Sequence, residues 1–184
     1  ELYKNSNEYM ERNNKILYYD CTNYYFEIEE ESGLRQYGKS KENRPNPIVQ
    51  MGMFMDGNGI PLAFDITPGN TNEQITLQPL EEKIIKDFEL AEFVVCTDAG
   101  LASNANRKFN NKNNRKFVTT QSIKKLKSHL KDDALDLTKG WKLTGSSKTY
   151  NISKLRTDEK LIEKYRDKIF YKERWINENG LEQR

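Results

Sequence analysis

A tight turn between two β-prone runs is the feature that most constrains how this chain can fold. Residues 48–55 are apolar, Asp56-Gly57-Asn58-Gly59 has the composition of a hairpin turn, and residues 60–66 are again mostly apolar. This pattern predicts an antiparallel hairpin, because Gly and Asn readily adopt the backbone angles that hairpin turns require. A lone hairpin is at best marginally stable in water, so further strands or a helix must complete the fold.

Strand and helix patterns alternate on both sides of this hairpin. A helix running to residue 88 is expected after a cap at Thr71 or Asn72, and the polar residues 1–15 form a lead-in that is helical only near 7–12. Other predicted elements are strands at 16–29, 93–96 and 116–120 and a short helix at 102–111. The order strand, hairpin, helix, strand, helix, strand predicts one α/β domain with a mixed sheet flanked by helices.

Beyond residue 121 the patterns are weaker. They indicate a helix within 122–130, a short β pair within 143–153 around Gly145-Ser146-Ser147, a helix at 157–167 and a strand at 169–175. We therefore divide the chain into the lead-in 1–15, a core at 16–121 and a further region at 122–184.

Charge is balanced overall but segregated along the chain. Thirty Lys and Arg against 28 Asp and Glu give a net charge of +2, which does not by itself indicate a nucleic-acid partner. Residues 107–131 hold Lys124, Lys125 and other basic residues without an acidic one, whereas 80–92 are mostly acidic. The basic run predicts a surface for a polyanion, and an ordinary solvated surface explains it about equally well.

Cysteine use and hydropathy bear on where the protein works. Cys21 and Cys96 lie far apart without CxxC partners, so neither a zinc site nor a disulfide framework is indicated. No window approaches the ~18 apolar residues of a membrane span, and no signal-peptide pattern opens the chain. We expect a cytoplasmic protein without membrane association. Because the sequence begins with Glu1 and ends at Arg184 without a clear structural stop, we expect a longer polypeptide.

Two aspartates end or interrupt apolar runs. Asp20 follows Ile16-Leu17-Tyr18-Tyr19, and Asp98 follows Phe93-Val94-Val95-Cys96-Thr97. Asp is depleted in strands and rarely buried without a partner, so both positions need an explanation. Adjacent strands can bring two carboxylates together, and such a pair binds Mg²⁺ or Mn²⁺ for phosphoryl transfer. A helix cap at a strand end remains an alternative.

A series of short motifs resembles the DDE transposases of bacterial insertion sequences. The motifs, in order, are Tyr19-Asp20-Cys21-Thr22, Gly38-Lys39-Ser40-Lys41-Glu42-Asn43-Arg44-Pro45, Gly52-Met53-Phe54-Met55-Asp56, Gly59-Ile60-Pro61-Leu62, Pro68-Gly69-Asn70 and Thr97-Asp98-Ala99-Gly100. The resemblance covers residues 16–121, and its specificity comes from the order and spacing of all the motifs together.

The resemblance implies an RNase H-like fold in which Asp20 and Asp98 are the first two catalytic acids and bind Mg²⁺ or Mn²⁺. The third acid of the family is a Glu on a helix that follows a largely β insertion, and residues 122–184 resemble the start of that insertion. We therefore expect the third acid downstream of Arg184, and no strand transfer by these 184 residues alone. The implied partners are DNA at the transposon ends and target, and further copies of the full-length protein.

Several residues keep two interpretations. The predicted DNA contacts are Lys39, Lys41, Arg44, Lys124 and Lys125, for which simple solvation is the alternative. Glu173 is a weak candidate for the third acid, because its segment is predicted as a strand and not as a helix. A non-catalytic DNA-binding module of the same fold is the alternative to a transposase.

Overall fold

The computed structural model describes residues 2–184 and divides them into two compact units. Unit 1 extends to Thr120, and unit 2 runs from Gln121 to Arg184. Within residues 2–184, none of the helices is both long enough and apolar enough to cross a bilayer.

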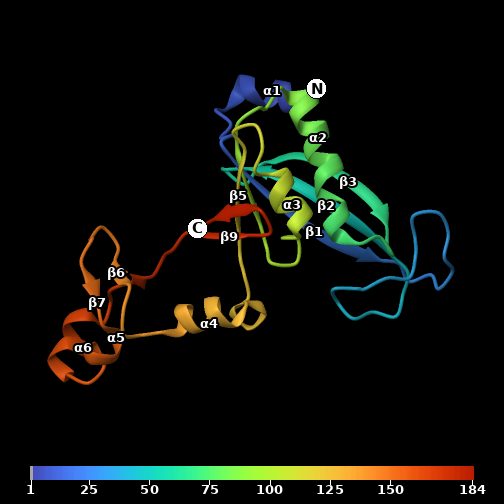
Figure 1. Ribbon diagram of the computed structural model, residues 1–184. Helices are drawn as coiled ribbons and strands as arrows, with labels where there is room; N and C mark the ends of the chain where they lie inside the picture. Colours follow the sequence, from blue (N-terminus) through green and yellow to red (C-terminus); the bar gives the residue numbers. More distant parts are fainter. Residues whose placement is uncertain (1) are drawn as a thin grey trace. The chain divides into compact units, whose positions relative to one another are not determined.

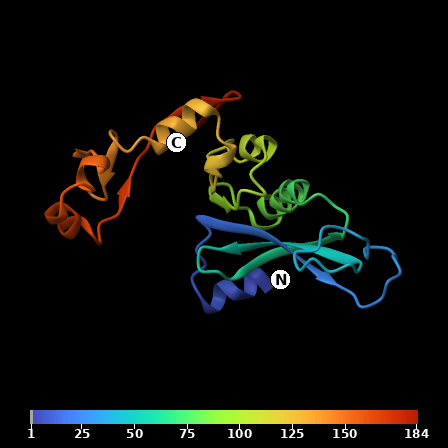
Figure 2. The ribbon, with the colours of Figure 1, turned by 90° about the horizontal axis from the view of Figure 1, so that it is seen from below.

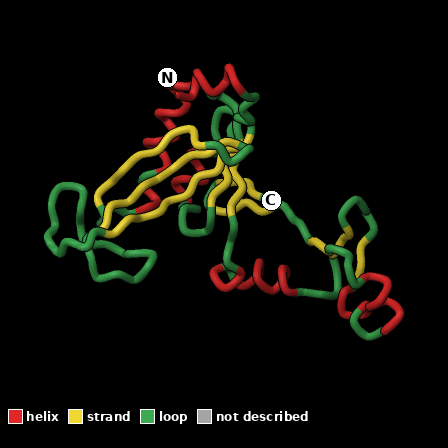
Figure 3. The backbone as a smooth tube through the Cα atoms, turned by 180° about the vertical axis from the view of Figure 1, so that it is seen from behind, coloured by secondary structure: helices red, strands yellow, loops and turns green. Residues whose placement is uncertain are grey.

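Unit 1 is built on a five-stranded mixed sheet with the order β3-β2-β1-β4-β5 (Figures 1 and 3). The central strand β1 is antiparallel to β2 and parallel to β4, while β3 continues the antiparallel side and β5 the parallel side. The strands are β1 (Ile16–Tyr25), β2 (Ile48–Asp56), β3 (Pro61–Pro68), β4 (Val94–Thr97) and β5 (Lys116–Thr119). This mixed sheet flanked by helices confirms the predicted α/β fold class.

The turn between β2 and β3 is held by the side chain of its first residue. Oδ1 of Asp56 accepts hydrogen bonds from the backbone N–H groups of Asn58 and Ile60, both at 2.9 Å. Gly59 has a φ of 79°, a conformation that costs glycine little. The predicted hairpin is therefore confirmed, with the turn chemistry that its sequence indicated.

Helix α2 (Leu77–Phe88) supplies most of the apolar cover of the sheet. The preceding 3₁₀ turn η1 (Glu73–Ile75) is capped by Asn72, whose Oδ1 accepts a hydrogen bond from the N–H of Gln74 at 3.0 Å. The cap at Asn72 thus belongs to η1, and α2 begins five residues later. Figure 2 shows α2 and α3 (Asn104–Phe109) on the same face of the sheet. The core combines α2, β1, β2 and β4 with the residues that flank β4: Leu17, Tyr19, Cys21, Phe54, Leu77, Leu80, Ile84, Phe93, Val95 and Leu101.

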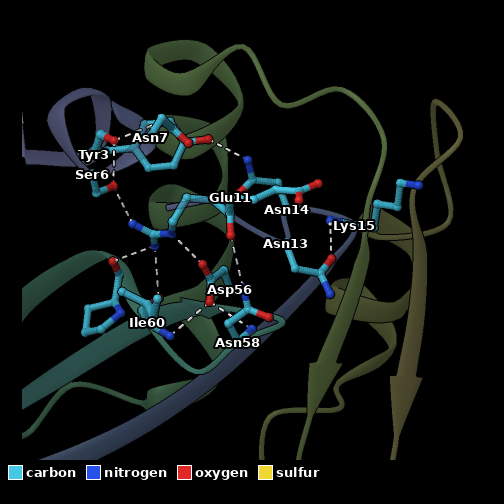
Figure 4. Close-up of polar contacts among 12 residues, drawn as sticks. Tyr3, Ser6, Asn7, Glu11, Asn13, Asn14, Lys15, Asp56, Asn58 and Ile60 are labelled. Carbon is cyan, nitrogen blue, oxygen red and sulfur yellow. Dashed lines mark hydrogen bonds and ion pairs between the residues drawn. The ribbon is translucent and has the colours of Figure 1, made fainter. Parts of the chain in front are cut away.

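The N-terminal segment is anchored by a buried ion pair. Helix α1 spans Leu2–Tyr9, earlier than the predicted 7–12. Nε of Arg12 lies 2.5 Å from Oδ2 of Asp56, and its Nη2 donates to the carbonyls of Ile60 and Pro61 (Figure 4). Burial acts against the charge on Asp56, but hydrogen bonds from Ile60 and Arg12 hold the pKa of this carboxyl below its usual value. The segment that we predicted as a polar lead-in is therefore tied to the β2–β3 hairpin.

Unit 2 combines two small antiparallel sheets with short helices. One sheet has the order β7-β6-β8, and the other is the pair β9–β10. Their bounds are β6 (Trp141–Leu143), β7 (Thr149–Tyr150), β8 (Phe170–Tyr171), β9 (Ile176–Glu178) and β10 (Leu181–Gln183), with α4 (Ser128–Leu135), α5 (Ile152–Leu155), α6 (Glu159–Tyr165) and the 3₁₀ turn η2 (Ile123–Lys125). The aromatic rings of Tyr150 in β7, Tyr165 in α6 and Phe170 in β8 pack edge to face, with centroids 5.4–5.9 Å apart.

The hairpin β9–β10 was not predicted, although its sequence contains a strong turn pattern. Asn179 and Gly180 both have positive φ, 55° and 71°, as the central residues of a type I′ turn do. Asn-Gly between β-prone residues is one of the strongest hairpin signals, and Ile176 and Leu181 flank this pair. The flanking strands are only three residues long, which made the pattern easy to overlook.

Candidate active site

Two aspartates follow the paired residues of the neighbouring parallel strands β1 and β4. The last residue pair between β1 and β4 is Tyr18 with Cys96, and paired residues differ by 78 in number. Asp20 and Asp98 also differ by 78, two positions beyond that pair. Continued two residues beyond the last pair, this register aligns Asp20, inside β1, with Asp98, the first residue after β4.

Asp20 faces away from the core. Its side chain is 68% exposed, whereas the neighbouring residues Tyr19 and Cys21 are 2% and 1% exposed. Alternate residues of a strand point to opposite faces, so Asp20 lies on the face opposite to α2. An exposed carboxylate in the central strand contributes little to packing and is available to bind a ligand.

The residues beneath Asp20 hold β1 in place. The hydroxyls of Tyr19 and Thr76 lie 2.6 Å apart, and Sγ of Cys21 lies 3.4 Å from the Tyr19 hydroxyl. A Cβ at Gly52 would meet that hydroxyl at 2.2 Å, which explains the glycine in β2. Burial raises the pKa values of both the Tyr19 phenol and the Cys21 thiol, so Cys21 is a packing residue and not a nucleophile.

Asp98 begins a turn that its own carboxylate stabilises. Oδ1 of Asp98 accepts a hydrogen bond from the N–H of Leu101 at 3.1 Å, and its carbonyl accepts one from Oγ1 of Thr119 at 3.0 Å. A Cβ at Gly100 would lie 3.3 and 3.4 Å from the two carboxylate oxygens. Gly100 therefore leaves room for the carboxylate to fold back over its own turn.

A lysine from the loop between β1 and β2 lies beside Asp20. Nζ of Lys41 is 3.9 Å from Oδ1 of Asp20 and donates a hydrogen bond to the carbonyl of Cys21. The N–H of Lys41 also donates to Oδ1 of Asn23, at 3.2 Å. This predicted DNA-binding residue is therefore held next to the first carboxylate.

Two glycines bring the motif loops of unit 1 into backbone contact. A Cβ at Gly38 would lie 1.9 Å from the carbonyl oxygen of Gly69, and a Cβ at Gly69 would lie 2.2 Å from that of Ile48. The N–H of Gly69 donates to the carbonyl of Leu34 at 3.1 Å. Because only glycine fits at either position, the loop bearing Lys41 and the Pro68-Gly69-Asn70 turn depend on each other.

The other predicted DNA contacts are exposed and come from two segments, one in each unit. Lys39 is on the same loop as Lys41, and the guanidinium of Arg44 lies 5.0 Å from the centroid of the Tyr25 ring. Lys124 and Lys125 belong to η2 in unit 2. Within unit 1, only Lys41 among these predicted contacts has a described contact with Asp20.

Glu173 forms ion pairs with basic residues of unit 2. Its carboxylate lies 3.4 Å from Nζ of Lys142 and also pairs with Arg184. The hydrogen bond from Arg184 holds the pKa of Glu173 below its usual value. Glu173 lies two residues after β8 and outside any helix; the strand predicted at 169–175 is limited to Phe170–Tyr171, so Glu173 is not in a strand either.

Besides the pair of Arg12 and Asp56, sequence reasoning missed a second buried charged pair in unit 1. Glu81 on α2 is fully buried, with Oε1 3.3 Å from Nε of Arg115. Burial raises the pKa of Glu81 to about 7. Arg115 was expected on the basic surface 107–131, and this placement was wrong because the residue is 6% exposed. The helical spacing offered a signal, since Glu81 lies four residues after Leu77 and three before Ile84 on the buried stripe.

The aspartate pair offers a partial metal site. Carboxylate oxygens are the ligands that Mg²⁺ and Mn²⁺ prefer. Asp20 and Asp98 could supply two such ligands, because the continued register of β1 and β4 aligns them and Gly100 leaves space around the second. Among residues 2–184, no group of three or more His, Cys, Asp and Glu side chains gathers as a metal site would require.

Comparison with known proteins places this geometry in context. Residues 26–183 match the family model described as "Transposase DDE domain", so the match begins after Asp20 and includes Asp98. Among curated proteins, none matches the chain.

Two solved structures resemble the chain. One is a Mos1 transposase paired-end complex with left transposon end, at 16% identity and a TM-score of 0.41. The other is a Mos1 mariner paired-end complex with Mn, at 14% identity and a TM-score of 0.39. Each match covers 63% of this chain and 38% of the other, so the matched part spans about two fifths of those proteins.

Proposed function

Since this chain belongs to the transposase DDE domain family, we propose that it is part of a transposase catalytic domain that performs metal-dependent DNA cleavage and strand transfer. The observation that carries the proposal is the parallel register of β1 and β4, which aligns Asp20 with Asp98 when it is continued by two residues. Both residues occupy the positions of the motifs through which the sequence resembles insertion-sequence transposases.

In this proposal Asp20 and Asp98 hold Mg²⁺ or Mn²⁺. When bound, such an ion activates an attacking hydroxyl and stabilises the leaving oxygen on phosphorus. Asp20 presents its carboxylate on the open face of the sheet, and the Leu101 N–H orients the carboxylate of Asp98. Two carboxylates leave ion coordination incomplete, so we propose that a further acidic ligand comes from outside these residues.

The substrate in this proposal is DNA, at the transposon ends and the target. Lys39, Lys41 and Arg44 extend from the loop nearest Asp20, where they would neutralise phosphates next to the reacting strand. Lys124 and Lys125 would add contacts from unit 2, which we assign to the start of the family's insertion. Copies of the full-length protein would assemble on the two ends, in the cytoplasm of the cell whose DNA is transposed.

The proposal is tested with Asp20→Asn and Asp98→Asn in the full-length protein. Each substitution keeps the size of the side chain and removes one anionic ligand, so we expect cleavage and joining to fall by about 100-fold or more. DNA affinity should remain within about threefold of wild type. Strand cleavage, strand joining and fluorescence anisotropy with end DNA measure these quantities.

Asp87→Asn is the matched control, since Asp87 is an exposed carboxylate on α2. It makes the same chemical change in the same unit and should leave cleavage unaltered. If Asp20→Asn and Asp98→Asn cleave as well as this control, the catalytic assignment is wrong, and retained DNA binding would then indicate a non-catalytic module.

A further inference from the structure

A buried amide on α3 links the Asp98 turn to the segment that precedes α2. Asn106 is 4% exposed, and its Nδ2 donates to the carbonyls of Leu101 at 2.8 Å and Gln74 at 2.9 Å. Its Oδ1 accepts a hydrogen bond from Nε2 of Gln78, also at 2.9 Å. A buried amide with such contacts is costly to replace, because its partners would lose their hydrogen bonds.

The side-chain amide of Gln74, in η1, also donates a hydrogen bond to the turn that follows Asp98. Nε2 of Gln74 donates to the carbonyl of Gly100 at 2.9 Å. Gly100 C=O and Leu101 N–H belong to one peptide group, and that N–H donates to Oδ1 of Asp98. The Gly100–Leu101 peptide therefore accepts from Gln74 on one side and donates to the carboxylate on the other.

Hydrogen bonds arranged in such a chain polarise one another. The donor at the Gly100 carbonyl strengthens the Leu101 N–H as a donor to Asp98. Asn106 holds both ends of the arrangement, because it binds the carbonyl of Gln74 as well as that of Leu101. The orientation of the Asp98 carboxylate is thus connected by direct contacts to η1 and α3.

We propose that Gln74 and Asn106 are positioning residues for the Asp98 carboxylate, Gln74 through the Gly100–Leu101 peptide and Asn106 through the carbonyls of Leu101 and Gln74. This inference rests on the proposed function, in which Asp98 is a metal ligand. Outer partners that orient ligating carboxylates typically contribute 10–100-fold to metal affinity or activity. A peptide held at both its C=O and its N–H keeps the carboxylate in one orientation before the ion arrives.

The decisive variant is Gln74→Met, which keeps an unbranched side chain of similar length and removes the donor. Gln36→Met is its control, because Gln36 makes an equivalent bond from Nε2 to the carbonyl of Gly33, at 3.1 Å, in the loop before β2. Two readouts are measured in the full-length protein: Mn²⁺ affinity by titration calorimetry and the NMR shift of the Leu101 amide proton without metal. The second readout does not depend on metal binding.

We expect Gln74→Met to lower Mn²⁺ affinity by about 10-fold and to move the Leu101 amide proton upfield, while Gln36→Met changes neither. Asn106→Leu should have the larger effect on both, and Gln74→Met decides the matter if Asn106→Leu does not fold. The inference is overturned if Asp98→Asn abolishes Mn²⁺ binding while Gln74→Met matches Gln36→Met in both readouts.

Failure of the proposed function has a different result. If Asp98→Asn leaves Mn²⁺ affinity unchanged, Asp98 is not a metal ligand, and Gln74 and Asn106 have no metal-binding carboxylate to position. A shift of the Leu101 amide in Gln74→Met would then report a structural link alone, which also overturns the inference.

Discussion

Nζ of Lys41 lies 3.9 Å from Oδ1 of Asp20 and donates a hydrogen bond to the carbonyl of the next residue, Cys21. The loop between β1 and β2 therefore brings a positive charge to the first carboxylate of the candidate site. Such a charge competes with a metal ion for Asp20, and it also attracts a phosphate. The competition for Asp20 is measured as metal affinity, and the attraction of phosphate is measured as DNA affinity.

Lys41→Ala should raise Mn²⁺ affinity by up to about fivefold, because an exposed pair at this distance contributes about 1 kcal/mol. The same change should reduce DNA affinity and lower the slope of log K against log salt by about one. Lys39→Ala is the control from the same loop. It should lower the salt dependence of DNA binding in the same way but leave Mn²⁺ affinity unchanged. Equal metal affinities for the two variants would contradict the prediction.

Gly100→Ala should weaken metal binding by disturbing Asp98. The new Cβ would lie 3.3 Å from the nearer carboxylate oxygen, closer than most side-chain contacts, so the carboxylate has to turn. We expect Mn²⁺ affinity to fall by about 10-fold with little change in thermal stability. Ala99→Gly alters the same turn without adding atoms, and an equal loss in that variant would point to backbone flexibility instead.

The stability of unit 1 should fall as the pH rises towards neutrality because of Glu81. Burial raises the pKa of Glu81 to about 7 in the folded state, above its ordinary value of 4.5. Between these two values the folded state holds a proton that the unfolded state has released, so the free energy of unfolding decreases by roughly 3 kcal/mol at most. Above pH 7 this contribution no longer changes.

Urea unfolding at pH 5 and pH 7.5 measures this dependence. Glu81→Gln should remove most of it, because the amide does not titrate. The exposed Asp87 on the same helix provides the control, and Asp87→Asn should keep the wild-type dependence. A pH profile of Glu81→Gln that overlays the wild type would show that other groups cause the effect.

Arg12→Met should destabilise unit 1 by about 3–5 kcal/mol, since it leaves the buried carboxylate of Asp56 without its cation. Replacing both partners, Arg12→Met with Asp56→Leu, should recover part of the Arg12→Met loss, although the turn loses the Asp56 cap. Arg166→Met breaks the exposed pair with Glu163, 2.8 Å apart, and should cost less than about 1 kcal/mol. Chemical denaturation of the three variants tests the ranking.

Local patterns were sufficient for most elements of unit 1. The turn residues Asp56 to Gly59 specify the hairpin through contacts within four residues, and the spacing of Leu77, Leu80 and Ile84 specifies α2. The position of α1 was less predictable, because Arg12 is held by Asp56, 44 residues away in sequence. The hairpin at Asn179-Gly180 is likewise specified locally, by an Asn-Gly pair whose two residues both have positive φ.

The candidate site shows the same division. Asp20 and Asp98 were recognisable because a carboxylate in an apolar strand requires a reason, and the sequence by itself determined both candidates together with the hairpin and α2. Only the tertiary structure decided that the continued register of β1 and β4 aligns them, that Lys41 lies beside the first, and that Gln74 and Asn106 hold the turn of the second. The physical reason is that hydrophobic periodicity acts within an element, whereas register and hydrogen bonds between elements arise only when distant segments pack together.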